Sequence, residues 1–203
     1  MSHTLTLYTN PKSRGRTARW MLEEIGAPYQ TQLIEYGAPM KTAEYLAINP
    51  MGKVPTLRHG PTVVTETAAI CAYLADAFPE AGLAPPPQAG LRGAYYRWMF
   101  FAAGPLEAAW TNQALGITVA PEREVMVGYG NLARVLDVLE GAVSQDEYLL
   151  GPRFSAADVY VGSQLGVGLH FGMIDPRPVF TDYWKRLSAR PAAVRAHAID
   201  GAF

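Results

Sequence analysis

The residues best suited to chemistry lie early in the chain, and the first of them is Ser13. It follows a short predicted strand and the turn Thr9-Asn10-Pro11-Lys12, and it precedes a predicted helix that begins at Arg14. Serine there can cap the helix, and its hydroxyl can also donate a hydrogen bond to a charged ligand atom. The single cysteine, Cys71, lies in an apolar predicted helix, where a thiol usually belongs to the core. Any reactive thiol is therefore expected to arrive with a ligand.

A second motif, Gly52-Lys53-Val54-Pro55, stands before a short predicted strand. The Val54–Pro55 bond is a candidate cis peptide bond. A cis bond would turn the backbone N–H and C=O of Val54 outward, where they could pair with a peptide ligand as a strand does. A tight turn with a trans proline is the alternative, and this motif alone does not separate the two. Glutathione, a peptide that carries a thiol, suits the first interpretation.

A third motif, Thr65-Glu66-Thr67-Ala68, opens a predicted helix. The N-terminus of a helix offers free N–H groups and a partial positive charge, which favour a carboxylate. Thr67 could bind the ligand's α-carboxylate through its hydroxyl and its N–H, while Glu66 pairs with the α-ammonium. An ordinary helix cap is the simpler alternative.

The hydrophobic periodicity predicts the elements that would position these motifs. The order is strand, helix, strand, short helix, two paired strands and helix, over residues 5–8, 14–25, 29–34, 41–48, 54–57, 62–65 and 67–78. Such an order, which begins with a βαβ unit, predicts a thioredoxin-like α/β domain over residues 1–80.

A second, all-helical domain is predicted over residues 88–203. The proline run at 85–87 marks the linker, because three prolines suit neither a helix nor a sheet. Helical periodicity then covers 91–110, 125–143 and 155–167, and a last packed helix is expected around Tyr183-Trp184-Lys185-Arg186-Leu187. Ser155 and Asp158 have the spacing of a capping box at the start of the third helix.

The composition excludes several classes of protein. The net charge of the 203-residue chain is −1, which gives no basic surface for nucleic acid or for an anionic membrane. One cysteine allows no internal disulfide, and the first ten residues lack the apolar core of a signal peptide. No apolar run is long enough to span a membrane. A cytoplasmic location is expected.

Four motifs in register resemble the bacterial cytosolic glutathione S-transferases of the serine type. They are Asn10-Pro11-x-Ser13-Arg14-x-Arg16 with Trp20-Met21-Leu22-Glu23-Glu24, Asn49-Pro50-x-Gly52-Lys53-Val54-Pro55, Glu66-Thr67-Ala68-x-Ile70 and Phe154-Ser155-Ala156-Ala157-Asp158. The resemblance covers both predicted domains. It implies that glutathione is bound by Ser13, Lys53, Val54, Pro55, Glu66 and Thr67, with Lys41 a weaker candidate for the glycyl carboxylate.

The resemblance also implies a mechanism. Ser13 would donate a hydrogen bond to the glutathione sulfur and stabilise the thiolate. Lowering a thiol pKa by about two units takes ~2.7 kcal/mol of such stabilisation. Tyr8 is the alternative, because in the tyrosine-type transferases a tyrosine ends the first strand before an Arg-Gly-Arg run, which Arg14-Gly15-Arg16 resembles. The loop after Tyr8 is longer here, so Ser13 is favoured.

The resemblance further implies a hydrophobic electrophile as second substrate, a role in detoxification, a homodimer, and no metal. Tyr96, Phe101 and Trp110, on the first helix of the second domain, are candidates to line the electrophile's pocket. Two alternatives remain: a glutathione-dependent isomerase or dehalogenase on the same fold, and a non-catalytic regulatory or docking module.

Overall fold

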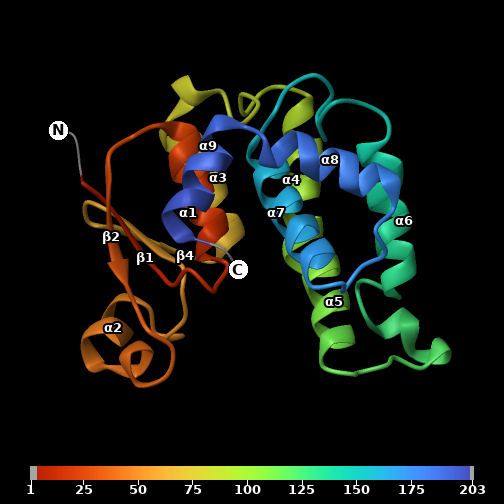
Figure 1. The fold of residues 1–203 in the computed structure, drawn as a ribbon, viewed down its shortest axis with the longest axis horizontal. Coiled ribbons are helices and arrows are strands. Elements are labelled where there is room, and N and C mark those ends of the chain that lie inside the picture. The colour runs from red at the N-terminus through yellow and green to blue at the C-terminus, as the bar shows by residue number, and fades with distance from the viewer. Residues whose placement is uncertain (1–3, 202–203) are drawn as a thin grey trace. The chain divides into compact units, whose positions relative to one another are not determined.

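The computed structural model describes residues 4–201, and its N-terminal part is built on one four-stranded sheet (Figure 1). The strand order is β2-β1-β3-β4, with bounds of Leu5–Thr9 for β1, Tyr29–Leu33 for β2, Thr56–His59 for β3 and Thr62–Thr65 for β4. β1 and β2 are parallel, whereas β3 is antiparallel to both β1 and β4. This is the thioredoxin-like arrangement that the sequence predicts.

Two helices cover one face of this sheet, α1 (Gly15–Ile25) and α3 (Thr67–Ala77). Leu5 and Leu7 alternate with less buried residues along β1, as expected of a strand with a single core face. The core beneath the helices consists of large apolar side chains: Leu5, Leu7, Trp20, Met21, Leu22, Leu57, Ile70 and Leu74. The short helix α2 (Ala43–Ile48) and the 3-10 turns η1 (Ala38–Lys41) and η2 (Pro79–Ala81) complete this part.

A helix that the sequence analysis missed, α9 (Pro191–Asp200), packs against α1 (Figure 1). The expected last helix is α8 (Pro178–Ser188), and the chain then continues into α9. One compact unit therefore consists of two segments, the chain up to Leu83 and the chain from Ala189 onward. The other unit is Ala84–Ser188. The predicted second domain, residues 88–203, instead divides in the structure between these two units.

The second unit consists of helices, as predicted. The stretch expected at 91–110 is α4 (Leu91–Phe101), a π-helical segment η3 (Ala102–Leu106) and α5 (Glu107–Ala114). Pro105 lies inside η3, where its ring and its missing N–H disturb regular α-helical hydrogen bonding. The side-chain amide of Gln164 on the neighbouring α7 (Ala156–His170) donates to the C=O of Ala102 at 3.1 Å.

The helix expected at 125–143 begins later than its periodicity indicates. Residues Pro121–Met126 form the 3-10 helix η4, and α6 runs over Leu132–Val143. Gly128 and Gly130 lie in the non-helical segment between η4 and α6, where glycine disfavours a helix. The Asn131 side chain then caps α6 by accepting from the N–H of Arg134 at 2.9 Å.

The capping box at the start of α7 is present as predicted. The carboxylate of Asp158 accepts from the N–H of Ser155 at 2.8 Å and from its hydroxyl at 2.9 Å. The same carboxylate accepts from the N–H of Leu149 and from the hydroxyl of Tyr183 on α8. One buried carboxylate thus ties the start of α7 to α8 and to the preceding turn.

Candidate functional site

The three predicted motifs emerge from one edge of the sheet. β1 ends at Thr9, β3 begins at Thr56 and β4 ends at Thr65. Tyr8 is the register partner of Thr56, and Thr56 is that of Thr65. Neighbouring strands lie about 4.8 Å apart, so these three chain ends stand side by side. The loop that carries Ser13, the Val54–Pro55 pair and the Glu66–Thr67 pair are therefore brought together.

The Val54–Pro55 peptide bond is cis, as one of the two interpretations of this motif predicted. Pro55 is buried and Val54 is half-buried. No group within residues 4–201 hydrogen-bonds to the backbone N–H or C=O of Val54. Val54 therefore presents one donor and one acceptor that an extended peptide ligand can pair with.

A buried polar network holds the loop before Val54, and the side chains that form it, Tyr45, Asn49 and Thr56, had no role predicted from sequence. The Asn49 amide donates to the C=O of Lys53 at 2.8 Å and to the hydroxyl of Thr56 at 3.0 Å. The Tyr45 hydroxyl donates to the same Lys53 carbonyl at 2.6 Å. Asn49 and Thr56 are almost fully buried, so these bonds are shielded from water. The network fixes the direction of the chain as it enters the cis bond.

Lys41 and Gly52 secure the other side of this loop. Gly52 has φ 57°, and a Cβ there would lie 2.6 Å from the C=O of Met40, so no larger residue fits without a shift. The Lys41 ammonium donates to the carbonyls of Met51 and Gly52, each at 3.1 Å. Lys41, considered above for a glycyl carboxylate, thus binds the chain itself, whereas Lys53 is exposed at the rim of the site.

The junction between β4 and α3 has an unusual backbone. Glu66 has φ 63° and ψ 121°, and it is the one residue other than glycine with positive φ within the described part of the chain. Such a conformation costs of order 1–3 kcal/mol and is found mainly at functional sites. No side chain caps the start of α3, so the N–H groups of its first turn remain available to an anion. Glu66 is exposed, and Thr67 is buried to 7% exposure.

Ser13 lies half-buried in the loop before α1, and its hydroxyl makes two local hydrogen bonds. It donates to the C=O of Asn10 at 2.7 Å and accepts from the N–H of Gly15 at 3.0 Å. Tyr8, the alternative, points to the opposite face of the sheet from Leu7, and its ring lies 5.9 Å from that of Tyr45. Its hydroxyl has no hydrogen-bond partner among residues 4–201. Both hydroxyls lie near the end of β1.

Asn10 organises the loop around Ser13, a role that the sequence analysis did not assign. Its amide donates to the C=O of Ile34 at 3.1 Å, and its side-chain oxygen accepts from the N–H of Lys12 at 3.0 Å. Gly15 allows the start of α1 to approach the end of β1, since a Cβ there would meet Thr9 Oγ1 at 1.9 Å. The position of Ser13 thus depends on buried neighbours on both sides.

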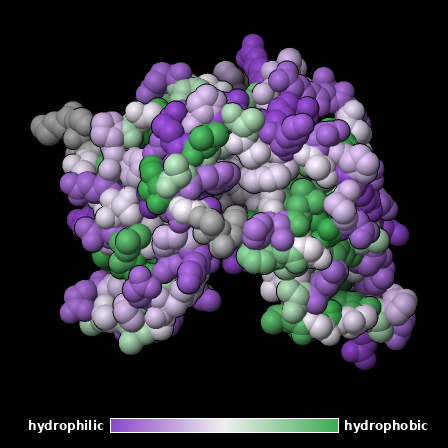
Figure 2. Space-filling model, in the orientation of Figure 1, coloured by the Kyte–Doolittle hydropathy of each residue, from purple (hydrophilic) through white to green (hydrophobic). Residues whose placement is uncertain are grey.

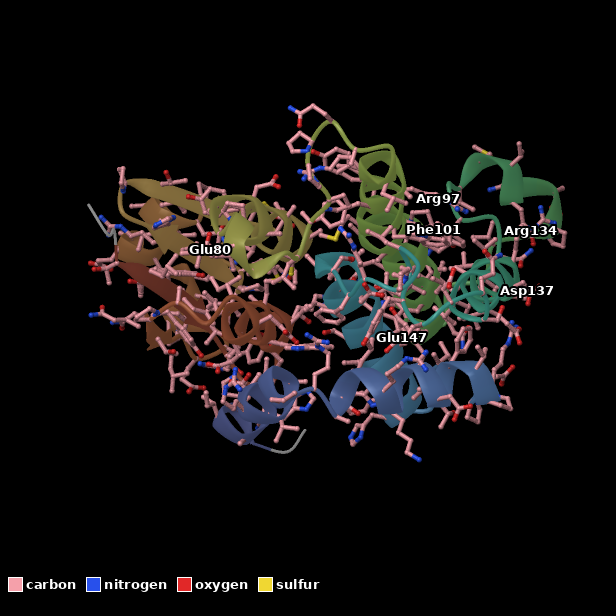
Figure 3. All side chains as sticks on the ribbon, turned by 90° about the horizontal axis from the view of Figure 1, so that it is seen from above. Glu80, Arg97, Phe101, Arg134, Asp137 and Glu147 are labelled. Atoms are coloured by element: carbon pink, nitrogen blue, oxygen red, sulfur yellow. The ribbon has the colours of Figure 1, made fainter. Side chains whose placement is uncertain are left out.

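The aromatic residues predicted to line the electrophile's pocket differ in their exposure to solvent. Phe101, labelled with Arg97 on α4 in Figure 3, is half-buried and packs edge to face on Trp98 at 5.5 Å. Trp110 is a core residue at 7% exposure, against Gly168 of α7. Tyr96 is exposed. Their role toward a substrate stays a prediction.

Cys71 is fully buried, and burial raises the pKa of its thiol to about 12, which agrees with a core role. A buried neutral thiol of this kind is inert as a nucleophile. Residues 4–201 contain no group of three or more histidine, cysteine, aspartate or glutamate side chains that could hold a metal ion.

Comparisons with known proteins agree with this geometry. Residues 13–77 match the family model of the glutathione S-transferase N-terminal domain, and residues 99–191 match that of the C-terminal domain. Glutathione S-transferase F10 of Arabidopsis thaliana is 28% identical over 93% of this chain and 94% of its own.

Solved structures add the fold in three dimensions. A glutathione transferase from Methylococcus capsulatus is 30% identical with a TM-score of 0.80, covering 98% of this chain and 99% of its own. A glutathione transferase homologue from Sulfitobacter with bound glutathione is 27% identical with a TM-score of 0.78, covering 98% and 99%. Two domains matched in order and a shared fold over nearly the whole length show that this chain belongs to the glutathione S-transferase family.

Proposed function

We propose that this protein is a glutathione S-transferase that binds glutathione at the sheet edge and activates its thiol for attack on a hydrophobic electrophile. The observation that carries the proposal is the open backbone of Val54, directly before the cis bond to Pro55, beside the uncapped start of α3. A tripeptide with a carboxylate at one end satisfies both features at once. The relatives with glutathione in their crystals support the same ligand.

Each of the three units of glutathione has a partner in this arrangement. Val54 pairs with the cysteinyl unit, and Pro55 holds the backbone of Val54 in place. The γ-glutamyl carboxylate accepts from the first N–H groups of α3 and from the Thr67 hydroxyl, while Glu66 pairs with the α-ammonium. Lys53, exposed at the rim, lies within the same loop and binds the glycyl end.

Ser13 is the proposed group that stabilises the thiolate. At rest its proton is donated to the Asn10 carbonyl, so the hydroxyl must rotate toward the sulfur when glutathione binds. A net intramolecular hydrogen bond is worth about 1 kcal/mol, whereas a bond to a charged acceptor is worth about 1.5–3 kcal/mol. The exchange of acceptors is therefore favourable. The thiol proton is released to solvent, the thiolate forms a carbon–sulfur bond with the electrophile, and the leaving group departs with its electron pair.

The first test is conjugation of glutathione to 1-chloro-2,4-dinitrobenzene, in which the carbon–sulfur bond forms and chloride leaves. Across a pH series we expect Ser13→Ala to lower kcat/KM at neutral pH by about ten- to a hundredfold and to move the thiolate titration to higher pH, because the hydrogen bond to the thiolate is lost. Tyr8→Phe is the matched variant, and it should leave the titration in place. The reverse pattern would assign thiol activation to Tyr8.

Calorimetry with glutathione separates the remaining alternatives. Binding without conjugation would direct the search to isomerase or dehalogenase substrates, because those reactions use the same thiolate. Absence of binding would leave a docking module with a transferase fold and would sink the proposal.

A homodimer, a cytoplasmic location and a role in detoxification are further parts of this proposal. In the helical unit, the exposed rings of Tyr96 and Phe100, one turn apart, form an apolar strip on α4 that a second subunit could cover. Another exposed apolar group lies near the end of α5 and η4, green in Figure 2: Leu115, Ile117, Val125 and Met126. Sedimentation of the wild type and of Phe100→Glu would test the α4 strip. Within residues 4–201 no helix has both the length and the apolar character needed to cross a bilayer.

A further inference from the structure

The C-terminal helix α9 packs against α1, and the order of the contacts between them is antiparallel. Near the C-terminal end of α1, the Glu24 carboxylate accepts both guanidinium bonds of Arg190, at 2.7 and 2.8 Å. One residue earlier, Glu23 pairs with Arg195 at 2.9 Å. In the middle, the buried pair Arg19–Asp200 is 2.8 Å long. The contacts therefore advance toward the start of α1 as the chain approaches its C-terminus.

The last of these contacts belongs to Arg16, in the first turn of α1. Its guanidinium donates to the C=O of Gly201 at 2.7 Å, just beyond α9. The other arm of the same guanidinium donates to the C=O of Pro11 at 3.3 Å, in the loop that carries Ser13. Arg16 is buried, so both bonds are shielded from solvent. A single side chain thus joins the C-terminal segment to the loop that holds the proposed thiol-activating hydroxyl.

The Gly201 carbonyl is itself held in place. Gly201 is the C-cap of α9, with φ 76°, and its N–H donates to the C=O of His197 at 2.9 Å. Arg19 fixes Asp200, the neighbouring residue, and donates from its other arm to Thr31 of β2 at 3.1 Å. The C-terminal segment is therefore a rigid support for Arg16, which a flexible tail would not be.

We propose that Arg16 is a positioning residue through which the docked C-terminal segment holds the loop of residues 10–14 in the geometry that thiol activation requires. The proposal rests on the proposed function of that loop. Arg16 acts through the backbone of Pro11, and so through Ser13. Loss of the Arg16 guanidinium should affect the glutathione sulfur more than the cysteinyl backbone that pairs with Val54 or the γ-glutamyl carboxylate at α3.

The test compares Arg16→Met with Arg195→Gln, which removes an α1–α9 contact far from the loop. Two readouts are needed: hydrogen–deuterium exchange of residues 10–14, and the pH titration of bound glutathione thiolate by its ultraviolet absorbance. In Arg16→Met we expect faster exchange, a thiolate titration shifted to higher pH, and kcat lowered about tenfold with the KM for glutathione changed less than about twofold, since a misplacement of 1 Å can cost up to a hundredfold. Arg195→Gln should leave all of these unchanged.

Arg16→Lys guards against a variant that fails to fold, because the lysine ammonium keeps the positive charge and can still donate hydrogen bonds. It should give an intermediate shift. Unchanged exchange and titration in a folded Arg16→Met protein would overturn the positioning role, as would equal shifts in Arg195→Gln. A wild-type protein that shows no bound thiolate would overturn the proposed function and the positioning role together, and that result is visible before any variant is made.

Discussion

At the scale of single residues, buried polar side chains support the loops of the site. Asn49 holds the Lys53 carbonyl before the cis bond, and Asn10 holds the Ile34 carbonyl beside the Ser13 loop. Backbone groups in such loops lack the partners that a helix or sheet supplies, so side-chain amides replace them. The residues expected to touch glutathione therefore depend on others that do not.

Replacing Asn10 with alanine should show this dependence. The change leaves the Ile34 carbonyl and the Lys12 N–H without their partner in a largely buried position, so we expect the free energy of unfolding to fall by about 1–3 kcal/mol. Urea denaturation measures it. Lys12→Ala, which removes an exposed side chain from the same loop, should change it by less than about 0.5 kcal/mol. Equal midpoints for Asn10→Ala and the wild type would contradict this account.

The sequence alone predicts candidate residues that contact the ligand, but it does not predict the side chains that hold their loops in place. A cis Val54–Pro55 bond was one of two interpretations of its motif, because cis peptide bonds occur mainly before proline, and Glu66–Thr67 was proposed because helix starts favour anions. Tyr45 and Lys41 carried no such local signal. Their contacts with the Lys53, Met51 and Gly52 carbonyls arise only when α2 and its neighbouring turn fold back on the loop.

At the scale of elements, the junction of β4 and α3 combines backbone strain with an uncapped helix start. A cap such as serine or aspartate before Thr67 would stabilise α3 but would occupy the N–H groups that a ligand needs. At the position before Thr67 stands Glu66, whose side chain is exposed and whose backbone has a positive φ. This junction is built at the expense of stability, as functional sites often are.

Glu66→Gly should therefore separate binding from stability. Glycine adopts positive φ without strain, which offsets its greater freedom in the unfolded chain, so the free energy of unfolding should stay equal or rise by up to about 1 kcal/mol. Glutathione should bind about tenfold more weakly, because its ammonium loses a charged partner. Urea denaturation and calorimetry give the two values.

Glu80→Gly is the matched control for that prediction. Glu80, labelled in Figure 3, is an exposed glutamate in η2 with no positive φ. Glycine there should lower the free energy of unfolding by about 0.5–1 kcal/mol and leave glutathione binding unchanged. If the free energy of unfolding fell equally in both variants, the positive φ at Glu66 would not destabilise the folded protein.

The helices of the second unit show which element boundaries periodicity can predict. The capping box of Ser155 and Asp158 located the start of α7, because both side chains act within one turn. The helix predicted at 125–143 begins seven residues before α6 does. The helical spacing of apolar residues continues through Gly128 and Gly130, although the helix itself starts only at Leu132. The two glycines, together with Asn131 as a favourable N-cap residue, are the sequence signals that mark the start of α6.

At the scale of the whole chain, α9 returns to the first unit and joins residues distant in sequence. Arg190 and Glu24 are 166 positions apart, and Arg19 and Asp200 are 181 apart. Each of these charges, taken alone in the sequence, suits a solvated helix face. Only the fold shows that they are partners, which is why the packing of α9 against α1 could not be predicted from sequence.

The docking of α9 should depend on pH through His197. Its ring lies 6.4 Å from that of Trp20 on α1, and burial, together with the Arg16 guanidinium, lowers the pKa of His197 from its ordinary value of 6.5. Between the lowered value and 6.5, the unfolded chain binds more protons than the folded one. The free energy of unfolding should therefore be fully retained above pH 6.5 and fall as the pH drops below it.

His197→Phe should remove this dependence, because phenylalanine keeps the ring contact with Trp20 and cannot titrate. Urea midpoints at pH 7.5 and pH 5.5 should differ less for His197→Phe than for the wild type. Val194→Gln, a change at an exposed position on the same helix that does not titrate, should retain the full difference. Hydrogen–deuterium exchange of α9 at the lower pH locates the effect, because loss of docking exposes this helix before the sheet. A wild type whose α9 stays equally protected at both pH values would show that the His197 charge is accommodated without undocking, and the acid sensitivity would then have to arise elsewhere in the fold.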